Sequence, residues 1–504
     1  MKIAAVLAYF CVLLFLGWWA SRKTRDMRDY FAGGKRMGFL SVAFSARATG
    51  ESAWLLLGLT GFGAAFGLKG LWIVAGELLG VALAWLWMAR RFKRLTDRYD
   101  SITIPDYLES RFRDSGHMIR LIAAGALLVF VPIYVSAQIH ATGTAFNDFL
   151  GWNYFVGAAV GFGIVLLYIT TGGFIAVVWS DVFQGTLMLL GLVALPIVGL
   201  WVAGGLDPVL ATLRADYPGH LTLHGGTGWT ALTIASVVGL LGIGIGFMGS
   251  PQVFVRFLAL RSESEIGKGA AVALVWTVLA DTGAVMTGVV GRALIEGDLG
   301  TDSESVLPMM VEQFLPVLVG GFFIAVVLSA IMSTIDSLLV VASSAAVRDC
   351  YQKYLHPELS DEGLVRLARI LTLVLALVAF LIAMAIAVLN GRQPIFWFVI
   401  FGWSGIAATF CPTIILSLFW RGFTARGAKL AMIAGFACVP VFKFGISRIP
   451  GIGEYIVALD VLAPSFAVSM LVGILASLTD PKRGELTAEA GGDLDWSAGR
   501  KKQS

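Results

Sequence analysis

The stretch that decides the fold runs from Phe44 to Trp54 and reads FSARATGESAW. Sequence apolar enough for lipid flanks it, with GFLSVA before it and LLLGLTGFGAAFG after it. Arg47, Gly50 and Glu51 place two charges and a glycine in the middle of an apolar span. A charge at the bilayer centre costs about 2.5 to 3.5 kcal/mol on insertion scales. We therefore expect a broken transmembrane helix whose freed carbonyls and polar side chains face a cavity instead of lipid.

The composition is that of an integral membrane protein. Of the 504 residues 58% are hydrophobic, and the net charge of +4 implies no nucleic-acid partner. The four cysteines lack metal-type spacing and lie in or beside apolar segments, so we expect no disulfide framework. The five histidines are scattered, and the sequence has neither a GxxxxGK[ST] loop nor a nucleophile–base pair. These observations argue against an enzyme, ATP drive and an organic cofactor.

Hydropathy predicts an all-α protein with about thirteen transmembrane helices in one domain, residues 1–480. The expected spans are about 3–19, 38–66, 69–89, 118–142, 153–171, 174–203, 230–249, 268–291, 316–346, 366–389, 395–419, 428–446 and 458–479. Basic residues fall in alternate loops, which predicts an N-terminus outside and a C-terminus in the cytoplasm of a cell (inner or plasma) membrane. The polar tail 481–504, which ends in the basic residues Arg500, Lys501 and Lys502, is expected to be disordered and cytoplasmic.

A second break is expected at GIGIGFMGSP, Gly242 to Pro251, because four glycines and a proline interrupt the apolar pattern. The two break candidates lie five spans apart, so each begins a five-span block, about 38–203 and about 230–419. An odd block length inverts the second block in the membrane. Inverted repeats with broken helices are typical of secondary transporters, in which solute and ion meet at the breaks. The same glycines could instead serve close helix packing.

Three further acids lie inside predicted spans: Glu77, Asp181 and Asp281. Ionisable residues at this depth mark ion or substrate paths by default. The sequence names no partner for Glu77 or Asp281.

The ninth expected span, about 316–346, and the segment after it contain SAIMSTIDSLLVVASSAAVRDCY from Ser329 to Tyr351. This stretch resembles the sodium/solute symporter family, most closely its sodium/proline branch. Four more segments are similar in order and spacing: DYFAGGKRMG, FSARATGESAWLLLGLTG, GSPQVFVRFLALRS and GWSGIAATFCPTIILSLFW. The resemblance covers about residues 3–480 and implies a LeuT-type fold with a 5+5 inverted repeat. Three helices, 3–19, 428–446 and 458–479, lie outside the repeats.

The resemblance also implies a sodium site between the second expected span, about 38–66, and the ninth, about 316–346. Matched residue by residue, its ligands are the carbonyls of Ala48, Glu51 and Ala330 and the hydroxyls of Ser333 and Thr334. The chemistry agrees, because a hard cation prefers oxygen ligands. The alternative is that both hydroxyls only bond back to carbonyls one turn earlier.

Asp181 matches an acidic position that the family uses near the ion path. The resemblance therefore allows a second ion site made of Asp181, Ser333 and Thr334. Asp336 lies on a neighbouring helical face and either tunes the site or makes a structural hydrogen bond.

This chain departs from the proline branch near both breaks. Gly50 stands where those transporters have an aspartate, and Glu51 where they are apolar. Ile243 and Phe247 replace a tryptophan and a tyrosine, whereas Pro251 is retained. The candidates for lining the solute cavity are Gly50, Ser52, Trp54, Gln138, Ile243, Phe247 and Pro251.

Arg47 and Glu51 lie four residues apart, so they can form a local ion pair. Alternatively, Glu51 supplies a carboxylate near the ion or binds a proton, and Arg47 tunes the site. These possibilities are not exclusive.

The sequence thus predicts a sodium-coupled symporter that imports a small polar solute, an amino acid such as proline, by alternating access. Sodium is the one cofactor expected. The alternatives are a proton-coupled symporter of an organic acid or another solute, and a transporter-like membrane sensor. The oligomeric state is not predicted.

Overall fold

The computed structural model describes residues 1–23, 26–295, 299, 303–353, 358–391, 393–481 and 491–499, without the side chains of 168–172 and 390. Its named elements are all helices, and one isolated β-bridge pairs Met37 with Leu260. The first half is α1 (Lys2–Ser21), α2 (Met27–Ala32), α3 (Phe39–Ala53), α4 (Thr60–Phe66), α5 (Leu71–Leu83), α6 (Ala89–Arg98), α7 (Ile104–Phe112), α8 (Met118–Leu150), α9 (Tyr154–Val202) and α10 (Leu206–Asp216). The second half is α11 (Ala231–Gly242), α12 (Pro251–Ala259), α13 (Ile266–Leu294), α14 (Val306–Phe314), α15 (Val317–Ser344), α16 (Asp361–Asn390), α17 (Ile395–Phe419), α18 (Ala425–Pro440), α19 (Gly453–Leu459) and α20 (Leu462–Leu478).

Within the described residues, ten helical segments are long and apolar enough to cross a membrane, or eleven when the bent pair α19 and α20 counts as one. One of them, Phe39–Arg98, has 60 residues. A single span needs about 20 residues, so this segment holds both predicted spans 38–66 and 69–89. Helix α9 has 49 residues and turns at Gly173, where φ is 59°. It holds the predicted spans 153–171 and 174–203. The all-α membrane fold is confirmed.

Both predicted breaks are present. In α3 the break is at Ser52, whose φ of 61° and ψ of −172° are not helical, and a π-helical turn over Trp54–Leu59 follows. A non-glycine residue in such a conformation costs about 1–3 kcal/mol. The second break follows α11, where a 3₁₀ turn over Ile243–Met248 leads to Pro251 at the start of α12. Proline suits that position, because the first N–H of a helix has no partner within the helix.

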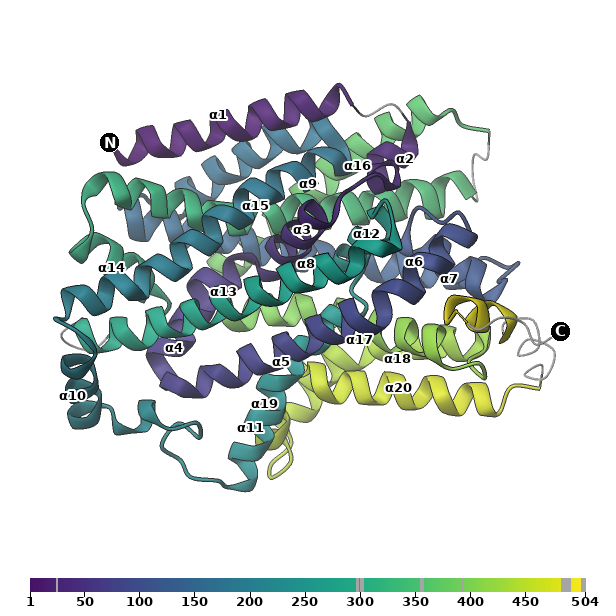
Figure 1. Cartoon of the computed structure of the whole chain (residues 1–504). Helices are drawn as coiled ribbons and strands as arrows, with labels where there is room; N and C mark the ends of the chain where they lie inside the picture. Colours follow the sequence, from purple (N-terminus) through teal and green to yellow (C-terminus); the bar gives the residue numbers. More distant parts are fainter. Residues whose placement is uncertain are drawn as a thin grey trace.

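Helix α3 lies in the middle of the molecule, where it packs against α9, α13 and α15. Figure 1 shows α1 along one edge and α20 along the opposite edge, with α3 between them. The most apolar window of α15 is 83% buried and that of α17 is 89% buried, against 28% in α16 and 22% in α18. Helices α15 and α17 therefore belong to the core, and α16 and α18 to the periphery.

Glycines let α5 approach the second break closely. A Cβ at Gly80 would lie 1.9 Å from the carbonyl oxygen of Gly244, and one at Gly244 would lie 1.9 Å from the carbonyl oxygen of Gly76. Contact between backbones at this distance requires residues without side chains. At Gly244 the packing role considered for the glycines of the second break is thus observed.

The polar tail differs in part from the expectation. Residues 491–497 are helical, and Asp493 is buried. Its carboxylate accepts a hydrogen bond from Tyr99 Oη at 2.8 Å and pairs with Arg98 at 3.2 Å. Hydropathy misses this segment because it is short and rich in polar residues. The predicted tail residues 482–490 and 500–504, including Arg500, Lys501 and Lys502, lie outside the described residues.

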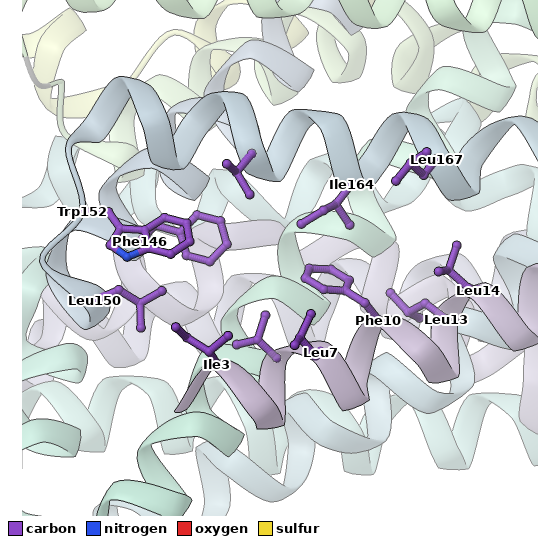
Figure 2. Close-up of a pocket in the computed structure, with 12 residues that line it drawn as sticks. Ile3, Leu7, Phe10, Leu13, Leu14, Phe146, Leu150, Trp152, Ile164 and Leu167 are labelled. Atoms are coloured by element: carbon purple, nitrogen blue, oxygen red, sulfur yellow. The ribbon is translucent and has the colours of Figure 1, made fainter. Parts of the chain in front are cut away.

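Figure 2 shows an apolar groove between α1 and the first half of α9, closed at one end by the end of α8. Its lining consists of Ile3, Val6, Leu7, Phe10, Leu13, Leu14, Phe146, Leu150, Trp152, Val160, Ile164 and Leu167. Side chains of this kind suit a lipid acyl chain and offer almost nothing to a polar solute. The solute site therefore has to be sought at the breaks.

Candidate ion and solute site

Helices α3 and α15 meet through the predicted sodium ligands. Ser333 Oγ donates to the carbonyl of Ala48 at 2.9 Å and to that of Ala330 at 3.1 Å. Thr334 Oγ1 donates to the carbonyl of Thr49 at 3.1 Å and to that of Ala330 at 3.2 Å. All five residues are buried. Each hydroxyl thus makes the bond within its own helix that was the alternative reading, and each also bonds to α3. The fold brings four of the predicted ligand residues together.

The fifth predicted ligand, the carbonyl of Glu51, lies at the break itself. It accepts a hydrogen bond from the backbone N–H of Trp54. Gln138 supports the break from α8, because its Oε1 accepts from the N–H of Ala53 at 3.0 Å. Ser52 Oγ accepts from Trp54 N–H at 3.1 Å. Ser52 and Gln138 were predicted to line the cavity. In the structure both accept hydrogen bonds from backbone N–H groups at the break and so stabilise it.

Asp181 lies on α9 in a buried network beside the α3–α15 contact. Its Oδ2 accepts from Ser45 Oγ at 2.5 Å and from Thr49 Oγ1 at 3.3 Å, and it pairs with Arg256 at 3.1 Å. Thr49 Oγ1 is also 2.8 Å from Ser337 Oγ. Asp181 therefore reaches α15 through Thr49, and the guanidinium of Arg256 lies beside it. Arg256 was not predicted from the sequence to be a partner of Asp181.

Asp336, the second tuning candidate, is buried on α15. It accepts a long hydrogen bond of 3.4 Å from the hydroxyl of Ser337. Its effect on ion binding remains a prediction.

Arg47 lies at the centre of a second buried network. It forms the predicted ion pair with Glu51 and also pairs with Glu77 at 3.1 Å and with Asp281 at 3.5 Å. The side chains of all four residues are at most 2% exposed. One oxygen from each carboxylate lies within 4.8 Å of the others. Three acids thus surround one cation, and the partner that the sequence could not name for Glu77 and Asp281 is Arg47.

Gly50 and Phe247 fit each other across the two breaks. A Cβ on Gly50 would lie 2.5 Å from Cε1 of Phe247. The guanidinium of Arg47 lies over the same ring, 4.7 Å from its centroid. A cation on an aromatic face is attracted by the ring quadrupole. In this chain the Phe247 ring therefore occupies the space that a side chain at position 50 would need.

Gly50→Ala is expected to lower the free energy of unfolding by about 1–3 kcal/mol, because the Phe247 ring must move in a packed core. The measurement is the melting temperature of the purified protein in detergent. Gly125→Ala is the control, since a Cβ on this glycine of α8 meets nothing within 4 Å. Adding Phe247→Leu to Gly50→Ala should recover part of the loss. An unchanged melting temperature in Gly50→Ala would contradict the fit.

A small cavity lies between the breaks and α17. Its lining is Gly50, Glu51, Trp54, Glu77, Tyr134, Ile243, Val399, Ile400 and Trp403. The predicted candidates Gly50, Trp54 and Ile243 are among these residues. Phe247 packs behind Trp403, with ring centroids 5.1 Å apart, and Pro251 begins α12 without lining the cavity. The contribution of α17 to the cavity was not predicted from the sequence, although GWSG in that helix carried part of the family resemblance.

A wider vestibule of about 450 Å³ lies on the other side of Phe396. The Phe396 ring is 5.5 Å from that of Trp54, which lines the inner cavity, and 5.0 Å from that of Phe62, which lines the vestibule. Glu304 holds the start of α17, because its carboxylate accepts from the N–H groups of Ile395 at 2.7 Å and Phe396 at 2.8 Å. Phe396 and Trp54 thus separate the vestibule from the inner cavity.

Two broken helices beside a small cavity, the first of which meets a third helix through neutral oxygens, are the arrangement of an ion-coupled secondary transporter. The sequence profile described as "Sodium:solute symporter family" matches residues 30–435, and the chain belongs to this family. It is a sodium-coupled symporter and a multi-pass membrane protein.

Curated relatives match over nearly the whole chain. The high-affinity proline transporter PutP of Bacillus subtilis is 34% identical, over 92% of this chain and 95% of its own length. The osmoregulated proline transporter OpuE of the same organism is 32% identical, over 98% of both chains. The sodium/proline symporter of Escherichia coli is 31% identical, over 92% of this chain and 94% of its own length.

Solved structures share the fold. A Na⁺-coupled sialic acid symporter in an outward-open state superposes with a TM-score of 0.81 at 20% identity, covering 95% of this chain and 98% of its own. MhsT in complex with L-phenylalanine superposes with a TM-score of 0.53 at 16% identity, covering 87% of this chain and 98% of its own. The predicted LeuT-type fold is confirmed.

Proposed function

We propose that this chain imports proline, or a close structural relative of proline, together with sodium. The observation that carries the proposal is similarity over more than nine tenths of the chain to three transporters named for proline, at 31–34% identity. The solute is moved unchanged, and sodium is the one cofactor. The repeats are residues 38–203 and 230–419, with the N-terminus outside and the C-terminus in the cytoplasm.

The proposed sodium ligands are the carbonyls of Ala48, Glu51 and Ala330 and the hydroxyls of Ser333 and Thr334. The hydrogen bonds that these hydroxyls make to Ala48 and Thr49 support the proposal, because they bring neutral oxygens from two helices to one place. Sodium bound here ties α3 to α15. It favours the outward-facing state only through a higher affinity for that state than for the inward-facing one.

A second ion site at Asp181 is proposed as a subsidiary feature. Asp181 touches α3 through Ser45 and Thr49, and two successive hydrogen bonds by way of Thr49 connect it to Ser337 of α15. Arg256 already supplies a positive charge there. A second sodium ion therefore requires the guanidinium to withdraw toward the carbonyl of Gln252, to which it donates at 2.6 Å.

Uptake of labelled proline into proteoliposomes tests the proposed function. Vesicles are given an inward sodium gradient, an inward proton gradient, or neither. We expect accumulation with the sodium gradient alone. Accumulation driven only by protons would establish the alternative coupling, and proline uptake that follows no gradient would refute symport of this solute. Labelled organic acids and sugars in the same vesicles test the remaining solute classes.

A further inference from the structure

The cavity at the first break has an unusual chemical lining. Two of its nine lining residues are carboxylates, Glu51 and Glu77, and three are aromatic: Trp54, Tyr134 and Trp403. None of the nine is basic. Carboxylates attract a cation by charge, and aromatic faces attract it through their quadrupoles. Of the common parts of a small solute, the lining therefore favours a positively charged nitrogen.

The buried acids at the cavity outnumber the cations that contact them among the described residues. Three buried acids, Glu51, Glu77 and Asp281, face Arg47, the one cation that contacts them among the described residues. If all four are ionised, the cluster has a net charge of −2, from one positive and three negative groups. Buried charge is tolerated only where it is paired. A further cation that enters the cavity beside Glu51 and Glu77 is therefore attracted strongly.

Arg47 does not line the cavity, so it is not placed to bind a solute carboxylate there, and its Nη2 contacts all three acids. The cavity offers another donor for that purpose. Trp54 is 3% exposed, and its indole Nε1 has no hydrogen-bond partner among the described residues. A buried N–H without an acceptor is costly, so it gains when a ligand supplies an oxygen. This unpartnered donor is independent of the acidic cluster and also points to a ligand.

We propose that the cavity is the subsite for the cationic nitrogen of the solute, with Glu51 and Glu77 as its counter-charges. The Trp54 N–H takes a carboxylate oxygen of the same solute. The substrate class is then a zwitterionic amino or imino acid, and organic acids without an amine are excluded. This inference rests on the proposed function, which supplies the transport assay. In the state described, the cavity has a volume of about 10 Å³, which is about the space that one water molecule needs. The solute therefore enters only when Trp54 and Phe396 withdraw.

Competition against labelled proline tests the inference on the unmodified protein. L-Prolinamide keeps the cationic nitrogen and loses the carboxylate, whereas (S)-tetrahydrofuran-2-carboxylate keeps the carboxylate and replaces the nitrogen with oxygen. We expect the tetrahydrofuran acid to inhibit sodium-driven uptake at least about tenfold more weakly than proline, because a buried charge-assisted hydrogen bond is lost. We also expect it to be weaker than L-prolinamide. Equal inhibition by proline and the tetrahydrofuran acid would overturn the inference and leave the proposed function intact.

If proline is not transported at all, the proposed function fails and the subsite is tested by binding. The melting temperature of the detergent-purified protein should then rise with L-prolinamide and stay constant with the tetrahydrofuran acid. The reverse order would overturn the inference.

Glu77→Gln tests whether the preference for a cationic nitrogen depends on the Glu77 carboxylate. The substitution keeps the shape and removes the charge, and Arg47 keeps two carboxylate partners. We expect the ratio of inhibition constants between the tetrahydrofuran acid and proline to fall about tenfold or more. Glu454→Gln, at an exposed glutamate of α19, is the control and should leave the ratio unchanged. If Glu77→Gln does not fold, Glu51→Gln takes its place. The inference would be overturned if both variants left the ratio at the wild-type value and uptake varied with pH. That result would mean that protons neutralise the acids.

Discussion

Arg47→Met is expected to destabilise the protein by about 3–5 kcal/mol, the cost of removing one partner from a buried ion pair. The loss leaves Glu51, Glu77 and Asp281 without the cation that each of them contacts. Methionine has a similar length and adapts to irregular gaps, so the change removes charge more than volume. Proteins are stable by only about 5–15 kcal/mol. Arg47→Met should therefore lower the melting temperature sharply and reduce the monodisperse fraction in gel filtration.

Arg261→Met is the matched control. Arg261 also pairs with a glutamate four residues away, Glu265, but its side chain is 62% exposed. Surface pairs of this kind contribute about 0–1 kcal/mol. The triple variant Arg47→Met, Glu77→Gln and Asp281→Asn should recover much of the stability, because it removes two of the unpaired charges as well. A melting temperature of Arg47→Met equal to that of Arg261→Met would contradict the central role of Arg47.

The breaks could be predicted because their causes are local in sequence. A glycine between two charges at residues 47–51, and four glycines before Pro251, are incompatible with an uninterrupted helix in lipid. The structure breaks α3 at Ser52 and interrupts the second helix at residues 243–250. The Arg47–Glu51 pair was predictable for the same reason, since residues four apart share a helical face.

The partners across helices could not be predicted. Glu77 is 30 residues and Asp281 is 234 residues from Arg47. Hydropathy detects that an acid lies within a span, but the rotation of that span about its axis is decided by packing, here of α5 and α13. Arg256 was missed for a related reason. A basic residue just after a span is typical of a cytoplasmic loop, yet α12 is buried throughout and directs this guanidinium to Asp181.

Ser333→Ala is expected to raise the sodium concentration for half-maximal proline uptake by at least about tenfold. Loss of even an outer-shell partner of a bound metal typically costs 10–100-fold in affinity, and Ser333 is a proposed direct ligand. The fold should tolerate the change. The lost hydrogen bonds are worth about 0.5–1.5 kcal/mol each, and alanine is the better helix former. The measurements are initial uptake rates against sodium concentration and the melting temperature of the same preparation.

Ser343→Ala separates the proposed ion ligand from an ordinary helical serine. Ser343 is buried on the same helix, and its hydroxyl donates to the carbonyl of Val340, three residues earlier, at 3.1 Å. It shares with Ser333 the residue type, the helix and the bond within the helix, and differs in that the Ser333 hydroxyl also reaches Ala48 on α3. Thr334→Ser, which keeps the oxygen, should behave like Ser343→Ala, whereas Thr334→Val should behave like Ser333→Ala. If the two serine variants shift the sodium dependence equally, the hydroxyls of α15 act through the helix and are not sodium ligands.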